Sequence, residues 1–163
     1  MLDFVLRRAY DLAVMPIQRL IPAMLAVFVA SFATGFLFHG VLLAPDYQLL
    51  TARGIYGGPE LFQVRWICMV AAYAAFGVAM VWIYSRNAEP KPWLPQGVRF
   101  GVAVWLLYPV TSFLIQFTVQ RIPKSVMLKQ VGLELVDKVL LGCLTAFLVS
   151  KVASKPLVKP RAA

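Results

Sequence analysis

Charged residues are scarce in this chain of 163 residues. They make up 14% of the sequence, against about 25% in an ordinary soluble domain, while hydrophobic residues make up 61%. So few charges do not cover a water-facing surface, which excludes an ordinary soluble domain. Together with several long apolar runs, this composition predicts an all-α integral membrane protein.

Acidic residues are scarcer still. Seven Asp and Glu stand against sixteen Lys and Arg, and the net charge is +9. In a soluble protein such an excess would indicate nucleic acid. Here the basic residues flank apolar runs and form no patch interleaved with aromatic side chains. We therefore expect contact with a lipid bilayer, and no nucleic acid.

Cysteine and histidine are too few for most metal and redox sites. Cys68 and Cys143 lie inside apolar runs without CxxC spacing, and His39 is the only histidine. This pattern indicates neither a disulfide framework nor a zinc site. One histidine also argues against haem ligation within a single chain. No cofactor and no metal site are predicted, and no catalytic motif of the common hydrolase or nucleotide-binding types is present.

Three apolar runs have the length of transmembrane helices, since about 20 residues at 1.5 Å rise each cross the hydrocarbon core, and a shorter fourth run is extended by neighbouring residues. They predict a four-helix bundle over residues 20–152, with spans at about 21–43, 62–84, 98–119 and 131–152. The fourth run is the unusual one. Its clean apolar part, 139–150, is too short to cross, so the helix must extend back through Glu134, Asp137 and Lys138.

The connections and the chain ends add three expectations. Pro109 should kink the third span, because its ring removes a backbone hydrogen bond. The long connection 44–61 contains a Gly-Gly-Pro turn signal and is expected to cap the bundle. Residues 1–19 are amphipathic and predict an N-terminal helix in the membrane interface, with a cytosolic helical extension as the alternative. Residues 153–163 form a basic tail.

The distribution of basic residues predicts the orientation. Ten Lys and Arg fall in 1–20, 85–99 and 151–163, whereas five fall in 44–65 and 120–130. Because cytoplasmic loops carry the excess of Lys and Arg, both termini should be cytoplasmic.

This orientation brings polar residues from all four spans into one layer near the outer surface. His39 shares a face with small residues four and eight positions earlier, and such faces meet neighbouring helices in lipid. We therefore expect His39 to point inward, within reach of Glu134 or Asp137. Glu134 and Lys138 stand in the favourable order for an ion pair four residues apart. The candidate polar cluster is His39, Arg65, Gln116, Glu134, Asp137 and Lys138.

Three interpretations of this cluster stay open. It is a buried ionic network that orients helices, a solvated outer vestibule, or a functional site that binds a ligand or relays a proton. We favour the first, because buried ionic networks at helix interfaces often serve only to orient the helices.

Three stretches carry a resemblance: "GFLFHGVLLAPDY", "GVRFGVAVWLLYP" and "KQVGLELVDKVLLGCLTAFL". Over roughly residues 25–150 the chain resembles small four-helix bacterial membrane proteins of unknown function. The resemblance implies a location in the bacterial inner (cytoplasmic) membrane. It brings no substrate, cofactor or catalytic residue.

These observations favour a non-enzymatic membrane protein, namely an accessory or scaffold subunit of a larger assembly or a homo-oligomer. The second span carries more small residues than one packing face needs, which indicates a membrane-protein partner or self-association: Ala71, Ala72, Ala74, Ala75, Gly77 and Ala79. The alternative is a binder or transporter of a small molecule or ion that uses His39, Glu134 and Asp137. A membrane enzyme would rest on that same constellation alone.

Overall fold

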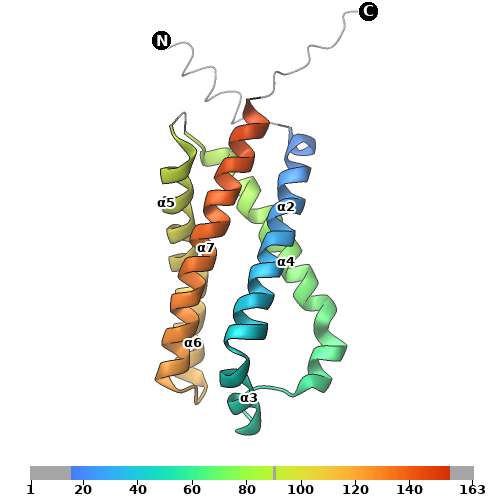
Figure 1. The fold of residues 1–163 in the computed structure, drawn as a ribbon, viewed down its shortest axis with the longest axis vertical. Helices are drawn as coiled ribbons and strands as arrows, with labels where there is room; N and C mark the ends of the chain where they lie inside the picture. Colours follow the sequence, from blue (N-terminus) through green and yellow to red (C-terminus); the bar gives the residue numbers. More distant parts are fainter. Residues whose placement is uncertain (1–15, 90, 155–163) are drawn as a thin grey trace, which may run out of the picture.

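The computed structural model describes residues 16–89 and 91–154, and this part of the chain is all-helical (Figure 1). Five continuous helical stretches form it, two of which contain a π-helical turn. They are α2 (Ile17–Gly35) with η1 (Phe36–Leu42), α3 (Ala44–Ala52), α4 (Pro59–Asn87), α5 (Trp93–Trp105) with η2 (Leu106–Val110) and α6 (Thr111–Val119), and α7 (Lys124–Ala153).

Three of these stretches are long and apolar enough to cross a membrane: Ile17–Leu42, Gln63–Asn87 and Trp93–Val119. By length and composition the chain is thus a multi-pass membrane protein. Helix α7 is equally long, but the described residues give it no window of comparable apolarity, because charged residues interrupt it. Each of the four long helical stretches begins three to seven residues before the predicted span and ends within three residues of its predicted end. Helix α7 begins directly after Pro123, which lies at its N-cap.

Helix α7 lies at the centre of the bundle. It packs along α5, and also against α2 and, over a shorter length, α4 (Figure 1). Helix α4 packs on α2 mainly through its second half, where its buried hydrophobic residues Met80, Val81 and Tyr84 join the main core. The first half of α4 leans away from the bundle, so the helices do not close completely on that side.

Glycines set the close approach of α5 and α7. A Cβ added at Gly97 would lie 2.6 Å from the Cα of Cys143, and one added at Gly101 would lie 2.6 Å from the Cα of Val139. From α7, a Cβ at Gly142 would lie 2.7 Å from the backbone nitrogen of Gly101. Backbone therefore meets backbone at these positions, which is how small residues bring helices together in lipid.

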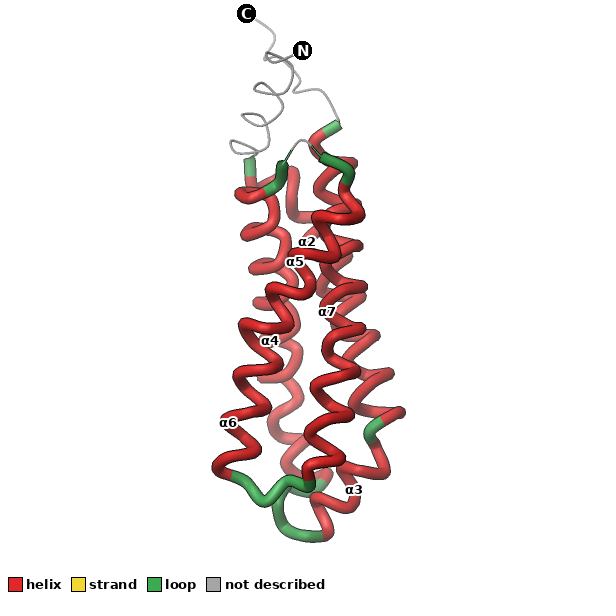
Figure 2. Tube along the Cα trace, turned by 90° about the vertical axis from the view of Figure 1, so that its left-hand side faces the viewer, coloured by secondary structure: helices red, strands yellow, loops and turns green. Residues whose placement is uncertain are grey.

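The long connection folds over one end of the bundle, as expected. It contains α3, which lies at the end opposite the two ends of the described chain (Figures 1 and 2). Leu50 of α3 is fully buried against Val126 and Met127 at the start of α7 and against Ile122 in the connection just before it. A cap built on this second small core holds α3 beside η1, where His39 lies.

Proline and the two π-helical turns modify the spans locally. Pro109 was expected to kink the third span, and the structure accommodates it within η2, a π-helical turn. The turn η1 was not predicted at all. Such turns often occur at functional sites, and both of them border the cavity described below. The predicted interfacial helix, residues 1–19, and the tail, 153–163, lie almost entirely outside the described residues.

Candidate functional site

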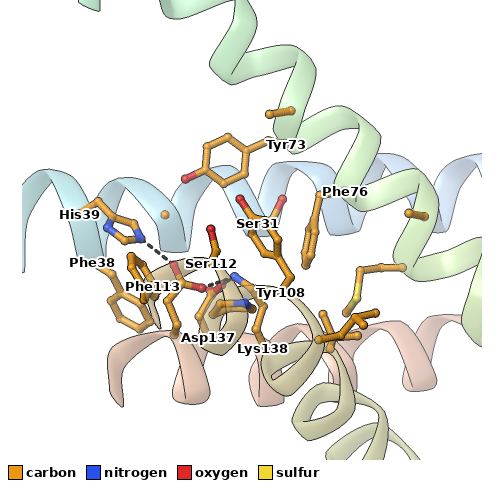
Figure 3. A pocket seen from close by; sticks show the side chains of 18 of the residues that line it. Ser31, Phe38, His39, Tyr73, Phe76, Tyr108, Ser112, Phe113, Asp137 and Lys138 are labelled. Atoms are coloured by element: carbon orange, nitrogen blue, oxygen red, sulfur yellow. Dashed lines mark hydrogen bonds and ion pairs between the residues drawn. The ribbon is translucent and has the colours of Figure 1, made fainter. Parts of the chain in front are cut away.

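A cavity of about 620 Å³ lies between α4 and the rest of the bundle (Figure 3). Its walls are mostly apolar and aromatic, and they come from every long helix. Tyr73 and Phe76 project from α4, Tyr108 lies on η2 and Phe113 lies on α6. The volume falls within the range of about 300–1,000 Å³ that is usual for sites that hold a small molecule.

The cavity opens sideways, in the middle of the candidate spans. Leu107 and Tyr108 line it but are 76% and 61% exposed, and Ala72 and Ala79 on the facing part of α4 are also exposed. These four residues lie near the centre of Gln63–Asn87 and Trp93–Val119. Where these two candidate spans cross a bilayer, such an opening faces the acyl chains.

Three charged residues of α7 form the polar wall of this cavity. Glu134, Asp137 and Lys138 are all buried and all line it. The ammonium of Lys138 lies 2.5 Å from Glu134 Oε2 and 2.5 Å from Asp137 Oδ2. The ion pair between Glu134 and Lys138 is the one predicted from their spacing. Asp137 shares the same cation instead of reaching His39 or Arg65.

His39 connects this group to the cap. Its Nε2 lies 2.8 Å from Glu134 Oε1, so the inward orientation and the contact with the polar stripe of α7 are both present. Its Nδ1 lies 2.5 Å from the hydroxyl oxygen of Tyr47 on α3. The side-chain amide of Gln130, one helical turn before Glu134, donates to that same hydroxyl over 3.1 Å.

The hydrogen-bond roles follow from this geometry. Burial raises the pKa of Tyr47, so its hydroxyl keeps its proton. The Tyr47 hydroxyl accepts from Gln130 and has its own proton to donate to Nδ1 of His39, in which case Nε2 carries the ring proton toward Glu134. A neutral His39 with its proton on Nε2 satisfies every one of these contacts, and so does a protonated ring, which donates from both nitrogens. In either form Tyr47 and Glu134 hold the two ring nitrogens of His39.

Three buried side-chain oxygens of the described residues have no hydrogen-bond partner: Gln130 Oε1, Glu134 Oε2 and Asp137 Oδ1. Glu134 Oε2 lies 2.5 Å from the ammonium of Lys138, and Gln130 does not line the cavity. Asp137 Oδ1 remains, since Lys138 faces the other oxygen, Oδ2. With His39 neutral, the group holds two carboxylates and one ammonium, a net charge of −1. A buried carboxylate oxygen without a donor is costly, so among the cavity-lining residues the polar group remains incomplete at Asp137.

The other two members of the predicted cluster do not join it. Gln116 lines the cavity and is half-buried, but the described contacts place no hydrogen bond between it and the charged group. Arg65 is exposed on the outward-leaning part of α4 and does not line the cavity. The site thus consists of His39, Glu134, Asp137 and Lys138. Within the described residues, no group of three or more His, Cys, Asp or Glu side chains is placed to hold a metal ion.

Tyr47 is the member of this hydrogen-bonded group that the sequence analysis missed. The signal was available, since Tyr47 follows His39 by eight residues within "GFLFHGVLLAPDY" and lies in the connection expected to cap the bundle. What the sequence does not contain is the position of α3, which depends on how Leu50 packs against α7.

The comparisons with known proteins identify no family. No family model, no curated protein and no solved structure matches the chain. The resemblance to four-helix bacterial membrane proteins therefore stands on the sequence patterns alone. What is shown is a small helical protein in which three candidate membrane-spanning helices pack together around a buried charged group.

Proposed function

We propose that this protein binds a small amphipathic molecule, taken from the membrane, in the cavity between α4 and the rest of the bundle. The observation that carries the proposal is the cavity itself, with aromatic walls, a sideways opening and one charged wall. The apolar part of a ligand would occupy the aromatic portion, and its polar end would meet Asp137 and Lys138.

The cavity changes the order of the interpretations drawn from the sequence. An ionic network that only orients helices is expected to be packed tightly on all sides. Here the charged side chains border a cavity instead. Ionisable residues inside a membrane bundle most often mark a binding site or an ion pathway. Among the described residues, the inner half of the bundle supplies no continuing row of ionisable groups, so binding fits better than transport across the membrane.

The same proposal includes a fourth span and an orientation. Helix α7 runs beside α5 along the bundle, and its 30 residues are long enough to cross, because about 20 suffice. Its charges meet one another and His39 inside the bundle, which removes the main objection to placing it in hydrocarbon. We infer that both termini are cytoplasmic, that α3 lies outside, and that the membrane is the bacterial inner one.

Cysteine labelling from outside intact cells tests this orientation. In a background without Cys68 and Cys143, a cysteine replacing Arg53, which follows α3, should react with a membrane-impermeant maleimide. A cysteine replacing Lys155 should react only after the cells are opened. The reverse pattern would place the charged group in the inner half of the membrane and refute the orientation.

A binding assay with matched variants tests the function. Ala72 and Ala71 are both exposed on α4, but only Ala72 lines the cavity. We expect mild detergent extraction of the wild-type protein to retain an amphipathic small molecule at about one per chain. Ala72→Phe should lose most of it, whereas Ala71→Phe should keep it. Mass spectrometry of an organic extract measures the amount, and equal amounts in all three proteins would count against the cavity.

An accessory or scaffold role is the second candidate. It is favoured by the exposed small and apolar residues on the lipid side of α4, among them Ala71, Ala75 and Val78. Lipid alone can also cover such a surface, so this observation supports a scaffold role less strongly than the cavity supports ligand binding. The same purification distinguishes the two candidates, because a scaffold would retain a stoichiometric protein partner or a second copy of the chain, and no small molecule.

A further inference from the structure

The unpartnered oxygen of Asp137 says what kind of polar group is missing from the cavity. Asp137 is 4% exposed, and its Oδ2 already receives the ammonium of Lys138. Its Oδ1 receives nothing from the described residues, although the hydroxyl of Ser112 and the amide of Gln116 line the same cavity. A carboxylate oxygen only accepts hydrogen bonds when it is ionised. The missing group is therefore a donor.

The charge balance says which sign that donor carries. Two carboxylates share one ammonium, and the neutral form of His39, which satisfies its contacts with Tyr47 and Glu134, adds no charge. One negative charge thus remains uncompensated in surroundings of low dielectric constant, where charge pairs interact strongly. A positively charged donor would complete the group, whereas an anionic ligand would add to the excess.

The aromatic walls of the cavity also favour a positively charged ligand group. The Nζ of Lys138 already lies 5.0 Å from the centroid of the Phe76 ring, so the cavity uses an aromatic face to hold a cation. Tyr73, Tyr108 and Phe113 supply further rings around the same space. A second ammonium beside Asp137 would have aromatic neighbours and would leave its hydrocarbon chain among the apolar walls.

We propose that the ligand is a single-chain lipophilic amine whose protonated amino group donates to Asp137 Oδ1. This inference rests on the proposed binding function and names its ligand class. An aminophospholipid offers the same ammonium, but its phosphate would bring a negative charge next to Glu134 and Asp137. The geometry therefore points to an amine without a phosphate, with the alkyl chain directed toward the opening at Leu107 and Tyr108.

Three probes of equal chain length test the inference. Octylamine, octanol and octanoate are dialysed to equilibrium against the protein in phosphatidylcholine nanodiscs, and binding is counted as the excess over the Ala72→Phe protein. We expect octylamine to bind about tenfold more tightly than octanol, which corresponds to about 1.4 kcal/mol, with octanoate the weakest. Asp137→Asn should reduce the preference for the amine to less than about threefold.

The control is Asp46→Asn, which removes a carboxylate paired with Lys129 at the cap and away from the cavity. It should leave the preference for octylamine unchanged. The comparison of the three probes needs only the wild-type and Ala72→Phe proteins, so it stays decisive if Asp137→Asn fails to fold.

The outcomes separate the two proposals. If octanol or octanoate binds as tightly as octylamine, the amine assignment is wrong and the binding function stands. If no probe binds in excess of Ala72→Phe, the binding function itself is wrong. Replacing half of the lipid with phosphatidylethanolamine tests the source of the ammonium. Loss of the octylamine excess in those nanodiscs would identify a lipid headgroup as the ligand and overturn the single-chain amine.

Discussion

Replacing Lys138 with methionine should lower the free energy of unfolding by about 3–5 kcal/mol, the usual cost of removing one partner from a buried ion pair. Lys138 is the one lysine of the group and lies 2.5 Å from an oxygen of both Glu134 and Asp137. Without it, two buried carboxylates would face each other in the bundle. Equilibrium unfolding in mixed micelles of a mild detergent and sodium dodecyl sulfate measures the change.

Lys129 provides the matched control on the same helix. Its Nζ lies 2.9 Å from Asp46 Oδ2, but the lysine side chain is 57% exposed. Exposed pairs contribute about 0–1 kcal/mol, so Lys129→Met should change the unfolding free energy by no more than that. Adding Glu134→Gln and Asp137→Asn to Lys138→Met should recover part of the loss, because it removes the uncompensated charges. Equal effects of the two lysine substitutions would show that the charged group is not buried in the folded protein.

Two glycines of α7 should respond in opposite directions to alanine. A methyl group at Gly142 would lie 2.7 Å from the nitrogen and 2.8 Å from the Cα of Gly101, so α5 and α7 must separate. Overpacking of this kind costs about 1–3 kcal/mol. Gly132 has no atom within 4 Å of an added Cβ. Gly132→Ala should therefore stabilise the helix by up to about 1 kcal/mol.

The same unfolding assay compares the two variants. Separation of α5 from α7 would also move η2 relative to Asp137 and Lys138, so Gly142→Ala should weaken ligand retention while Gly132→Ala leaves it intact. A Gly142→Ala protein as stable as the Gly132→Ala protein would contradict the close approach of these two helices.

Periodicity and spacing predicted much of the charged group. The four-residue spacing of Glu134 and Lys138 gave their ion pair, and the face shared by Ser31, Gly35 and His39 gave the inward orientation of the histidine. Both predictions depend only on the geometry of a single helix. They succeed because lipid leaves a polar side chain few places to turn except toward the other helices.

The level of a residue along the membrane normal did not predict correctly which other residues join the polar cluster. Arg65 was assigned to the cluster because it lies near the same level as His39, but a common level does not specify which way a helix faces or leans. The first half of α4 leans outward, which carries Arg65 away and leaves the cavity beside Tyr73 and Phe76. The inclination of a helix is set by packing along its whole length, and no local pattern in the sequence encodes it.

The turns η1 and η2 illustrate a second limit. Pro109 predicted that the helix is irregular at this point but not which irregularity it has. A missing backbone donor is compatible with a kink or with a π-helical turn. In η1 no proline is present, and the turn brings His39 to Tyr47 and Glu134 at once. These contacts join residues from three helices, so they become visible only when the helices are assembled.

Photoaffinity labelling tests the central claim, that the cavity holds an amphipathic molecule, most directly. An octylamine that carries a photoactivatable diazirine on its chain is irradiated with the protein in nanodiscs, and adducts are mapped by mass spectrometry. We predict adducts concentrated on cavity-lining residues such as Phe76 and Phe113, suppressed in Ala72→Phe and retained in Ala71→Phe. Adducts spread over outward-facing residues such as Leu25 and Val29, with no difference between the two variants, would contradict it.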